Sequence, residues 1–160
     1  MLISEIFKVE NIKLTIQSED KEELFEEMVN FLVDAETLSN RDEILEGLWR
    51  REKKMTTGIA PNIAVPHTHI PNIEKTIGVI GVSQKGIEYD ALDGNPVHLV
   101  MMLIGKDTEP EGHLKVLKNL AILMTNPNFY PSIMSSKTEK ELHNTIVEFE
   151  DLTKYYCNGK

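Results

Sequence analysis

The chain has 160 residues, of which 41% are hydrophobic and 27% charged, as in an ordinary soluble globular domain with one core. Its formal charge of -9 argues against duplex nucleic acid and anionic membranes as partners, because both favour basic surfaces. No apolar run approaches bilayer length, and the amino terminus lacks a basic region followed by a hydrophobic one, so we expect a cytoplasmic protein without direct membrane insertion.

The first part of the chain predicts one strand and two helices. Residues 11–16 (NIKLTI) alternate polar and apolar side chains, as a half-buried strand does. Asp20 and Glu23 have the spacing of a capping box and predict the start of a helix. A second helix is expected to open near Asn40 and to end in the charged run RREKK.

The second part of the chain predicts buried strands and then helices. Strands are expected at IAV (63–65), TIGVIGV (76–82) and VHLVMMLI (97–104), and the last two are apolar enough to be buried on both faces. Thr108 and Glu111 suggest a capping box for a helix with Leu114, Leu117, Leu120, Ala121 and Met124 on its apolar stripe. Residues 128–135 and 138–150 predict two further helices.

These elements predict an α/β fold with a mixed, mostly parallel sheet that is sandwiched by helices on both faces. We expect one domain over residues 1–150 and a polar tail over residues 151–160. The single cysteine, Cys157, lies in that tail, so neither a disulfide framework nor a thiolate metal cage is predicted.

The stretch IAVPHTHI places two histidines directly after a predicted buried strand. Pro66 cannot donate the next ladder hydrogen bond, so we expect the strand to stop there and His67 to lie in a loop. Ligands are commonly bound where strands end in such folds. A neutral histidine offers one ring nitrogen as a nucleophile, and phosphoryl capture suits that state.

The sequence around the other histidines and around Arg50 and Arg51 indicates a role for each. His98 lies inside an apolar strand and is interpreted as structural, and His143 is assigned to a solvated helix face. His113 falls in the first turns of a helix, where an anion is favoured and a neutral imidazole can donate a hydrogen bond. Arg51, which precedes the loop leading to His67, offers the planar fork that matches phosphoryl oxygens, whereas Arg50 is interpreted as solvated.

The segment REKKMTTGIAPNIAVPH resembles the active-site segment of the fructose-mannitol IIA domains of the bacterial phosphoenolpyruvate-dependent sugar phosphotransferase system. GHLKVLKNLA is similar to the segment around that family's second histidine. The resemblance implies a mannitol-type IIA fold and a phosphoryl carrier in which His67 is phosphorylated on Nε2, His113 hydrogen-bonds the phosphoryl group and Arg51 helps to neutralise it. It also implies the phosphocarrier protein HPr as donor and a IIB component as acceptor, and through IIB a IIC permease, with no cofactor or metal.

The chain departs from this family after the active histidine, where Thr68 replaces the usual small residue and a third histidine, His69, follows. Two alternatives remain open. One is a regulatory phosphoprotein of the nitrogen-related branch, which acts by phosphorylation-dependent protein binding. The other is a metal site formed by His67, His69 and His113. Neither the sugar nor the oligomeric state is predicted from the sequence.

A carrier must dock and leave, and small interfaces with an apolar centre suit such exchange. We therefore expect apolar residues around His67, with Ile59, Ile70 and Pro71 as candidates, and acidic side chains mostly elsewhere.

Overall fold

The computed structural model describes residues 1–158 and contains one sheet with helices on both of its faces. The helices are α1 (Ile3–Ile6), α2 (Lys21–Glu36), α3 (Arg41–Glu52), α4 (Pro110–Thr125), α5 (Phe129–Met134) and α6 (Glu139–Asn158), with a short 3-10 turn, η1, at Val9–Asn11. The strands are β1 (Ile12–Lys13), β2 (Ile63–Ala64), β3 (His67–Ile70), β4 (Ile77–Ile87) and β5 (Val97–Lys106).

The sheet is mixed, as predicted. Its order is β1-β4-β5-β2, and β3 also pairs with β5. The β4–β5 pairing is antiparallel, whereas β1–β4, β2–β5 and β3–β5 are parallel. Since β2 pairs with Leu99 and Val100 and β3 pairs with Leu103–Lys106, β2 and β3 occupy successive stretches of the same edge of β5.

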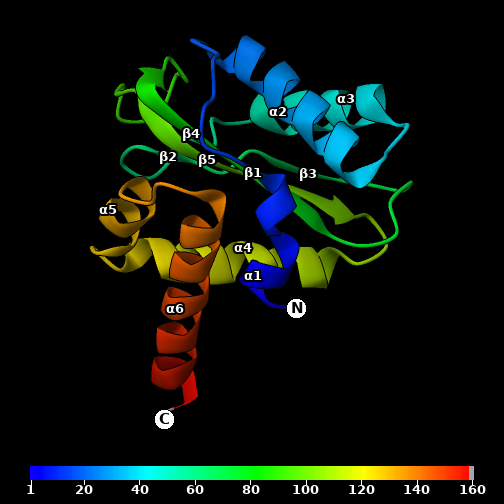
Figure 1. The fold of residues 1–160 in the computed structure, drawn as a ribbon. Helices are drawn as coiled ribbons and strands as arrows, with labels where there is room; N and C mark the ends of the chain where they lie inside the picture. The colour runs from blue at the N-terminus through cyan, green and yellow to red at the C-terminus, as the bar shows by residue number, and fades with distance from the viewer. Residues whose placement is uncertain (159–160) are drawn as a thin grey trace.

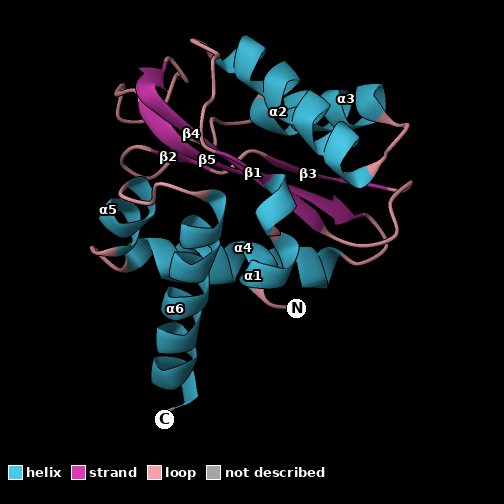
Figure 2. Cartoon of the chain, viewed as in Figure 1, coloured by secondary structure: helices cyan, strands magenta, loops and turns pink. Residues whose placement is uncertain are grey.

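Two cores hold the sheet between its helices. Alternate residues of β5 face opposite ways, so Val100 and Met102 pack with α2 and α3, and Met101 and Leu103 pack with α1, α4, α5 and α6. Figure 1 shows α2 and α3 above the sheet and the other helices below it, and Figure 2 shows the same three layers by element type. The predicted sandwich is confirmed.

Several predicted boundaries are wrong. The strand predicted at residues 11–16 is only Ile12–Lys13. Asn11 belongs to η1, and residues 14–16 lie outside the strand, although the Ile16 backbone N–H donates to the Val82 carbonyl at 3.0 Å. The helix predicted to end at residue 150 continues to Asn158, and the sequence offers no proline or glycine before Gly159 to stop it. Part of the predicted tail is therefore helix, and residues 159–160 lie outside the described residues.

One of the two predicted capping boxes is formed in part, and the other is absent. At α2, the Asp20 side chain accepts from the Glu23 backbone as expected, but the Glu23 carboxylate accepts from the Glu19 backbone rather than from Asp20. At α4, the predicted capping box is wrong, because the N-cap is Glu109 and makes no side-chain cap bond. Pro110 occupies the first turn, where its missing donor costs nothing.

The buried face of α4 also differs from the predicted stripe. Leu114 is 67% exposed, whereas the buried residues are His113, Val116, Leu120 and Leu123. The inward face is thus centred one residue earlier than the leucine pattern indicated. This shift turns His113 toward the sheet.

Candidate phosphoryl site

His67 begins a strand instead of lying in a loop, so that prediction is wrong. The edge strand is interrupted at Val65 and Pro66 and then resumes as β3, with His67 opposite Leu103. An edge position tolerates proline, and the Pro66 carbonyl still accepts from the Leu103 backbone N–H at 3.0 Å. A hydrogen-bonded strand therefore fixes the backbone of the PHTH motif.

Strand alternation separates the side chains of this motif. Ile70 packs in the core formed with α2 and α3, and Thr68 is buried against Gly47 of α3. His67 and His69 therefore face the other way, toward α4. A Cβ at Gly47 would lie 2.6 Å from the Thr68 hydroxyl oxygen, so Gly47 is what allows a threonine at the position after His67.

His113 of α4 meets both of these histidines. Its ring centroid lies 5.7 Å from that of His67 and 5.6 Å from that of His69, which approaches edge-on. His113 is only 5% exposed, and within residues 1–158 neither of its ring nitrogens has a hydrogen-bond partner. Two free nitrogens on a buried ring beside His67 suit a donor held ready for an oxygen of a bound group.

A glycine that sequence reasoning missed makes room for this ring. A Cβ at Gly105 of β5 would lie 2.1 Å from Nδ1 of His113, so no other residue fits there without moving the ring. Gly105 follows a run of apolar strand residues, and only the pairing of β5 with its neighbours and α4 reveals its role.

The tautomer of His67 follows from its hydrogen bond. Nδ1 lies 2.8 Å from the Val65 carbonyl oxygen, and since a carbonyl only accepts, Nδ1 carries the proton. Nε2 of the neutral ring then keeps its lone pair. Burial is the main cause that lowers the pKa of His67 below its ordinary value, and this keeps the nucleophilic neutral form at neutral pH.

Burial also lowers the pKa of His113 to about 4, with smaller contributions from His67 and His69. We expect an NMR titration of its ring protons to show a midpoint near that value, well below the ordinary 6.5. Because the unfolded chain binds this proton at a higher pH than the folded chain does, the free energy of unfolding should decrease as the pH falls between these two values. A midpoint near 6.5 would contradict the burial of this ring.

Cations from α3 and from the turn that follows it complete the site. Gly47, Arg50, Arg51, Lys54, His67, Thr68, His69 and His113 line a cavity of about 250 Å³. Arg51 donates from Nη1 to the Met55 carbonyl at 2.9 Å, which leaves its other donors available. The solvated role assigned to Arg50 is incomplete, because Arg50 also lines this cavity. No Asp or Glu is among these lining residues, so the cavity suits a small anion.

None of the three residues predicted for the apolar rim lines the histidine cavity. Ile59 is 57% exposed, but Ile70 is buried in the core, and Pro71 lines a different hollow. Leu114, directly after His113, and Met55, whose carbonyl binds Arg51, are exposed instead.

The remaining histidines have structural contacts. Nδ1 of His98 lies 2.9 Å from the Ser83 carbonyl oxygen, which confirms the structural role predicted for it. The solvated position predicted for His143 is wrong, because its Nε2 donates to the Ser4 carbonyl of α1 at 2.8 Å.

The alternative of a metal site gains no support from the geometry. His67, His69 and His113 are neighbours, but in the described part of the chain no group of three or more His, Cys, Asp or Glu side chains is arranged to hold a metal ion.

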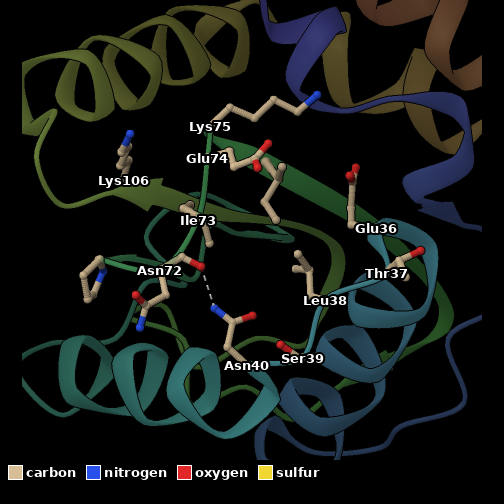
Figure 3. Close-up of a pocket in the computed structure, with 12 residues that line it drawn as sticks. Glu36, Thr37, Leu38, Ser39, Asn40, Asn72, Ile73, Glu74, Lys75 and Lys106 are labelled. Carbon is tan, nitrogen blue, oxygen red and sulfur yellow. Dashed lines mark hydrogen bonds between the residues drawn. The ribbon is translucent and has the colours of Figure 1, made fainter.

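A larger hollow of about 780 Å³ lies beyond the carboxyl end of β3 and shares no lining residue with the histidine cavity. Figure 3 shows the residues that line it. Asn40 donates to the Asn72 carbonyl across it at 3.0 Å, and its charged residues are of both signs: Glu36, Glu74, Lys75 and Lys106. It contains no histidine and carries none of the chemistry of the histidine site.

Similar proteins place this fold and its histidine segments in a known family. The family model for the phosphoenolpyruvate-dependent sugar phosphotransferase system, EIIA 2, matches residues 5–149. The fructose-specific EIIABC component of Bacillus subtilis is 32% identical over 146 residues, which are 91% of this chain but 23% of that protein. The chain thus spans about a quarter of this relative. Within residues 1–158, no helix combines the length and apolarity needed to cross a bilayer.

Solved structures of IIA proteins have the same fold. Nitrogen regulatory protein IIA-Ntr from Neisseria meningitidis superposes with a TM-score of 0.83 at 28% identity, over 90% of this chain and 98% of that one. The Escherichia coli mannitol IIA, solved in complex with phosphorylated IIB, shares the fold with a TM-score of 0.73 at 20% identity, over 89% of this chain and 97% of that one. The family model covers nearly the whole fold and both histidine segments, so the chain belongs to the EIIA 2 family of the phosphoenolpyruvate-dependent sugar phosphotransferase system.

Proposed function

We propose that the chain is a phosphoryl-carrier IIA component of a sugar phosphotransferase system. The observation that carries this proposal is the orientation of His67, whose Nδ1 is held by the Val65 carbonyl while its ring borders a cavity lined with cations. The lone pair on Nε2 attacks phosphorus, the N–P bond to His67 forms, and the bond to the phosphohistidine nitrogen of HPr breaks. Nε2 then gives up the phosphoryl group to a IIB component by the same exchange.

His113 and Arg51 stabilise the phosphoryl group in this proposal. His113 is close enough to His67 for both rings to contact one phosphoryl group, and its free ring nitrogens supply a donor. Arg51 supplies a fork of N–H donors that matches the charge spread over the phosphoryl oxygens. Mass measurement after incubation with phosphoenolpyruvate, enzyme I and HPr tests the proposal, since one acid-labile phosphate should appear.

A nitrogen-type regulatory role is the second candidate, and the similarity to IIA-Ntr of Neisseria meningitidis favours it. Both roles use the same phosphohistidine, so acceptance from HPr does not separate them. Transfer onward does: a transport component passes its phosphoryl group to a IIB component, whereas a regulatory component retains it. The genes beside this one, IIB and IIC or regulatory, give an independent answer.

Arg51→Ala should slow phosphoryl transfer about 10-fold and shorten the lifetime of the phosphohistidine, because charge-assisted hydrogen bonds are lost while Arg50 and Lys54 still line the cavity. Arg51→Lys should restore the rate only in part, since an ammonium lacks the planar fork. Quenched-flow transfer from phosphorylated HPr measures both effects. Arg41→Ala, at the other end of α3, is the matched control, and equal rates for Arg51→Ala and wild type would contradict this role.

A further inference from the structure

Next to Arg51 lies a buried carboxylate that the proposed transfer does not use. Glu52 is 6% exposed and does not line the histidine cavity. Its Oε1 lies 3.0 Å from Nζ of Lys21 and accepts from the Thr57 backbone N–H at 2.9 Å. Its Oε2 accepts from the Thr57 hydroxyl at 2.7 Å. Glu52 thus anchors the loop that leads from α3 to the histidine motif.

From Thr57 the hydrogen bonds continue to His67. The Thr57 carbonyl accepts from the Val65 backbone N–H at 3.2 Å, and the Val65 carbonyl accepts from Nδ1 of His67 at 2.8 Å. The backbone of Val65 is therefore bonded through its N–H to Thr57 and through its carbonyl to the His67 ring. It lies in the interruption between β2 and β3, where ladder bonds to β5 do not hold it.

We propose that Glu52 is a positioning residue, which holds the loop at Thr57 and, through the backbone of Val65, keeps His67 in the tautomer with a free Nε2. The inference rests on the proposed phosphoryl function. A second bond supports the anchor, since the Thr57 hydroxyl also lies 2.7 Å from the Tyr89 hydroxyl, and Nζ of Lys21 lies 4.5 Å from the Tyr89 ring centroid. The Thr57 side chain is therefore held by Glu52 on one side and by Tyr89, in the segment after β4, on the other.

The tautomer matters because the two neutral forms of imidazole differ in the nitrogen that is free. If the Val65 carbonyl turned away, the proton could move to Nε2, and the nitrogen facing the cavity would lose its lone pair. The Glu52 carboxylate also raises the pKa of His67, opposing burial and the charge of Arg51. The charged or titratable groups that act on His67 are Arg51, Glu52, His69 and His113.

Glu52→Gln tests this role, because it keeps the size of the side chain but exchanges an acceptor oxygen for a donor. Nitrogen-15 NMR of the histidine rings should show a larger population of the tautomer protonated on Nε2 at His67. Acceptance from phosphorylated HPr should slow roughly 10-fold, as for the loss of one hydrogen bond that fixes a reactive form. Glu46→Gln removes the same charge from an exposed position of α3 and should change neither readout.

Glu52→Gln leaves the largely buried Lys21 without its partner and could therefore prevent folding. A second variant keeps the proposal testable in that case. Glu52→Asp keeps the charge but is one methylene too short to reach both Lys21 and Thr57, and it should show the same tautomer shift. If either variant folds and His67 keeps the wild-type tautomer, the proposal is overturned, even if phosphoryl transfer by that variant is slow. If wild type accepts no phosphoryl group, the proposed function fails, and the tautomer measurement still tests the link between Glu52 and His67.

Discussion

His67→Ala should abolish phosphoryl acceptance. The change removes the attacking nitrogen, so no N–P bond can form at this position, and the neighbouring groups cannot replace that bond. Incubation with phosphoenolpyruvate, enzyme I and HPr should leave the intact mass of the variant unchanged, while wild type gains one phosphate that is lost in acid. Thermal unfolding should remain cooperative, because His67 lies on an edge strand and, in the described part of the chain, its ring makes a single hydrogen bond, to the Val65 carbonyl.

His143→Gln is a suitable control, since it replaces a histidine of α6 and keeps a donor for the Ser4 carbonyl. It should accept phosphate like wild type. An acid-labile phosphate on His67→Ala would show that another residue is the acceptor. His69 would then be the first candidate, because its ring lines the same cavity.

The layers of the fold could be predicted because β4 and β5 are long apolar runs and the helices carry regular stripes. Composition and local pattern determine such features. The site residues His67, His113 and Arg51 were identified mainly from the resemblance to IIA domains, and the structure brings all three to one cavity. Their roles in transfer remain predictions.

The path of the chain around His67 could not be predicted from local pattern. Pro66 correctly marks an interruption, but whether a strand resumes after it depends on the free edge of β5, which is distant in sequence. The inward turn of His113 is also not evident from the sequence, since the predicted apolar stripe of α4 includes Leu114, which is exposed in the structure. The interpretation of Arg50 as solvated is incomplete for a similar reason: nothing in the run RREKK shows which cations line the histidine cavity.

Gly105→Ala should impair the site almost as much as removal of His113. The added methyl group would lie 2.1 Å from Nδ1 of His113, so the ring must leave its present position beside His67. Loss of one donor aimed at a transferring group commonly slows a step on the order of 10²-fold, and we expect this effect on transfer from phosphorylated His67 to IIB. Acceptance from HPr should survive, because the nucleophile and its Val65 bond are intact.

Gly112→Ala is the matched control, because a Cβ at that position of α4 meets nothing within 4 Å and alanine favours a helix. It should transfer like wild type. Since Gly105→Ala acts through the ring of His113, combining it with His113→Ala should add little to the loss caused by His113→Ala alone. Additive losses, or a folded Gly105→Ala variant that transfers at the wild-type rate, would show that the position of the His113 ring does not govern transfer.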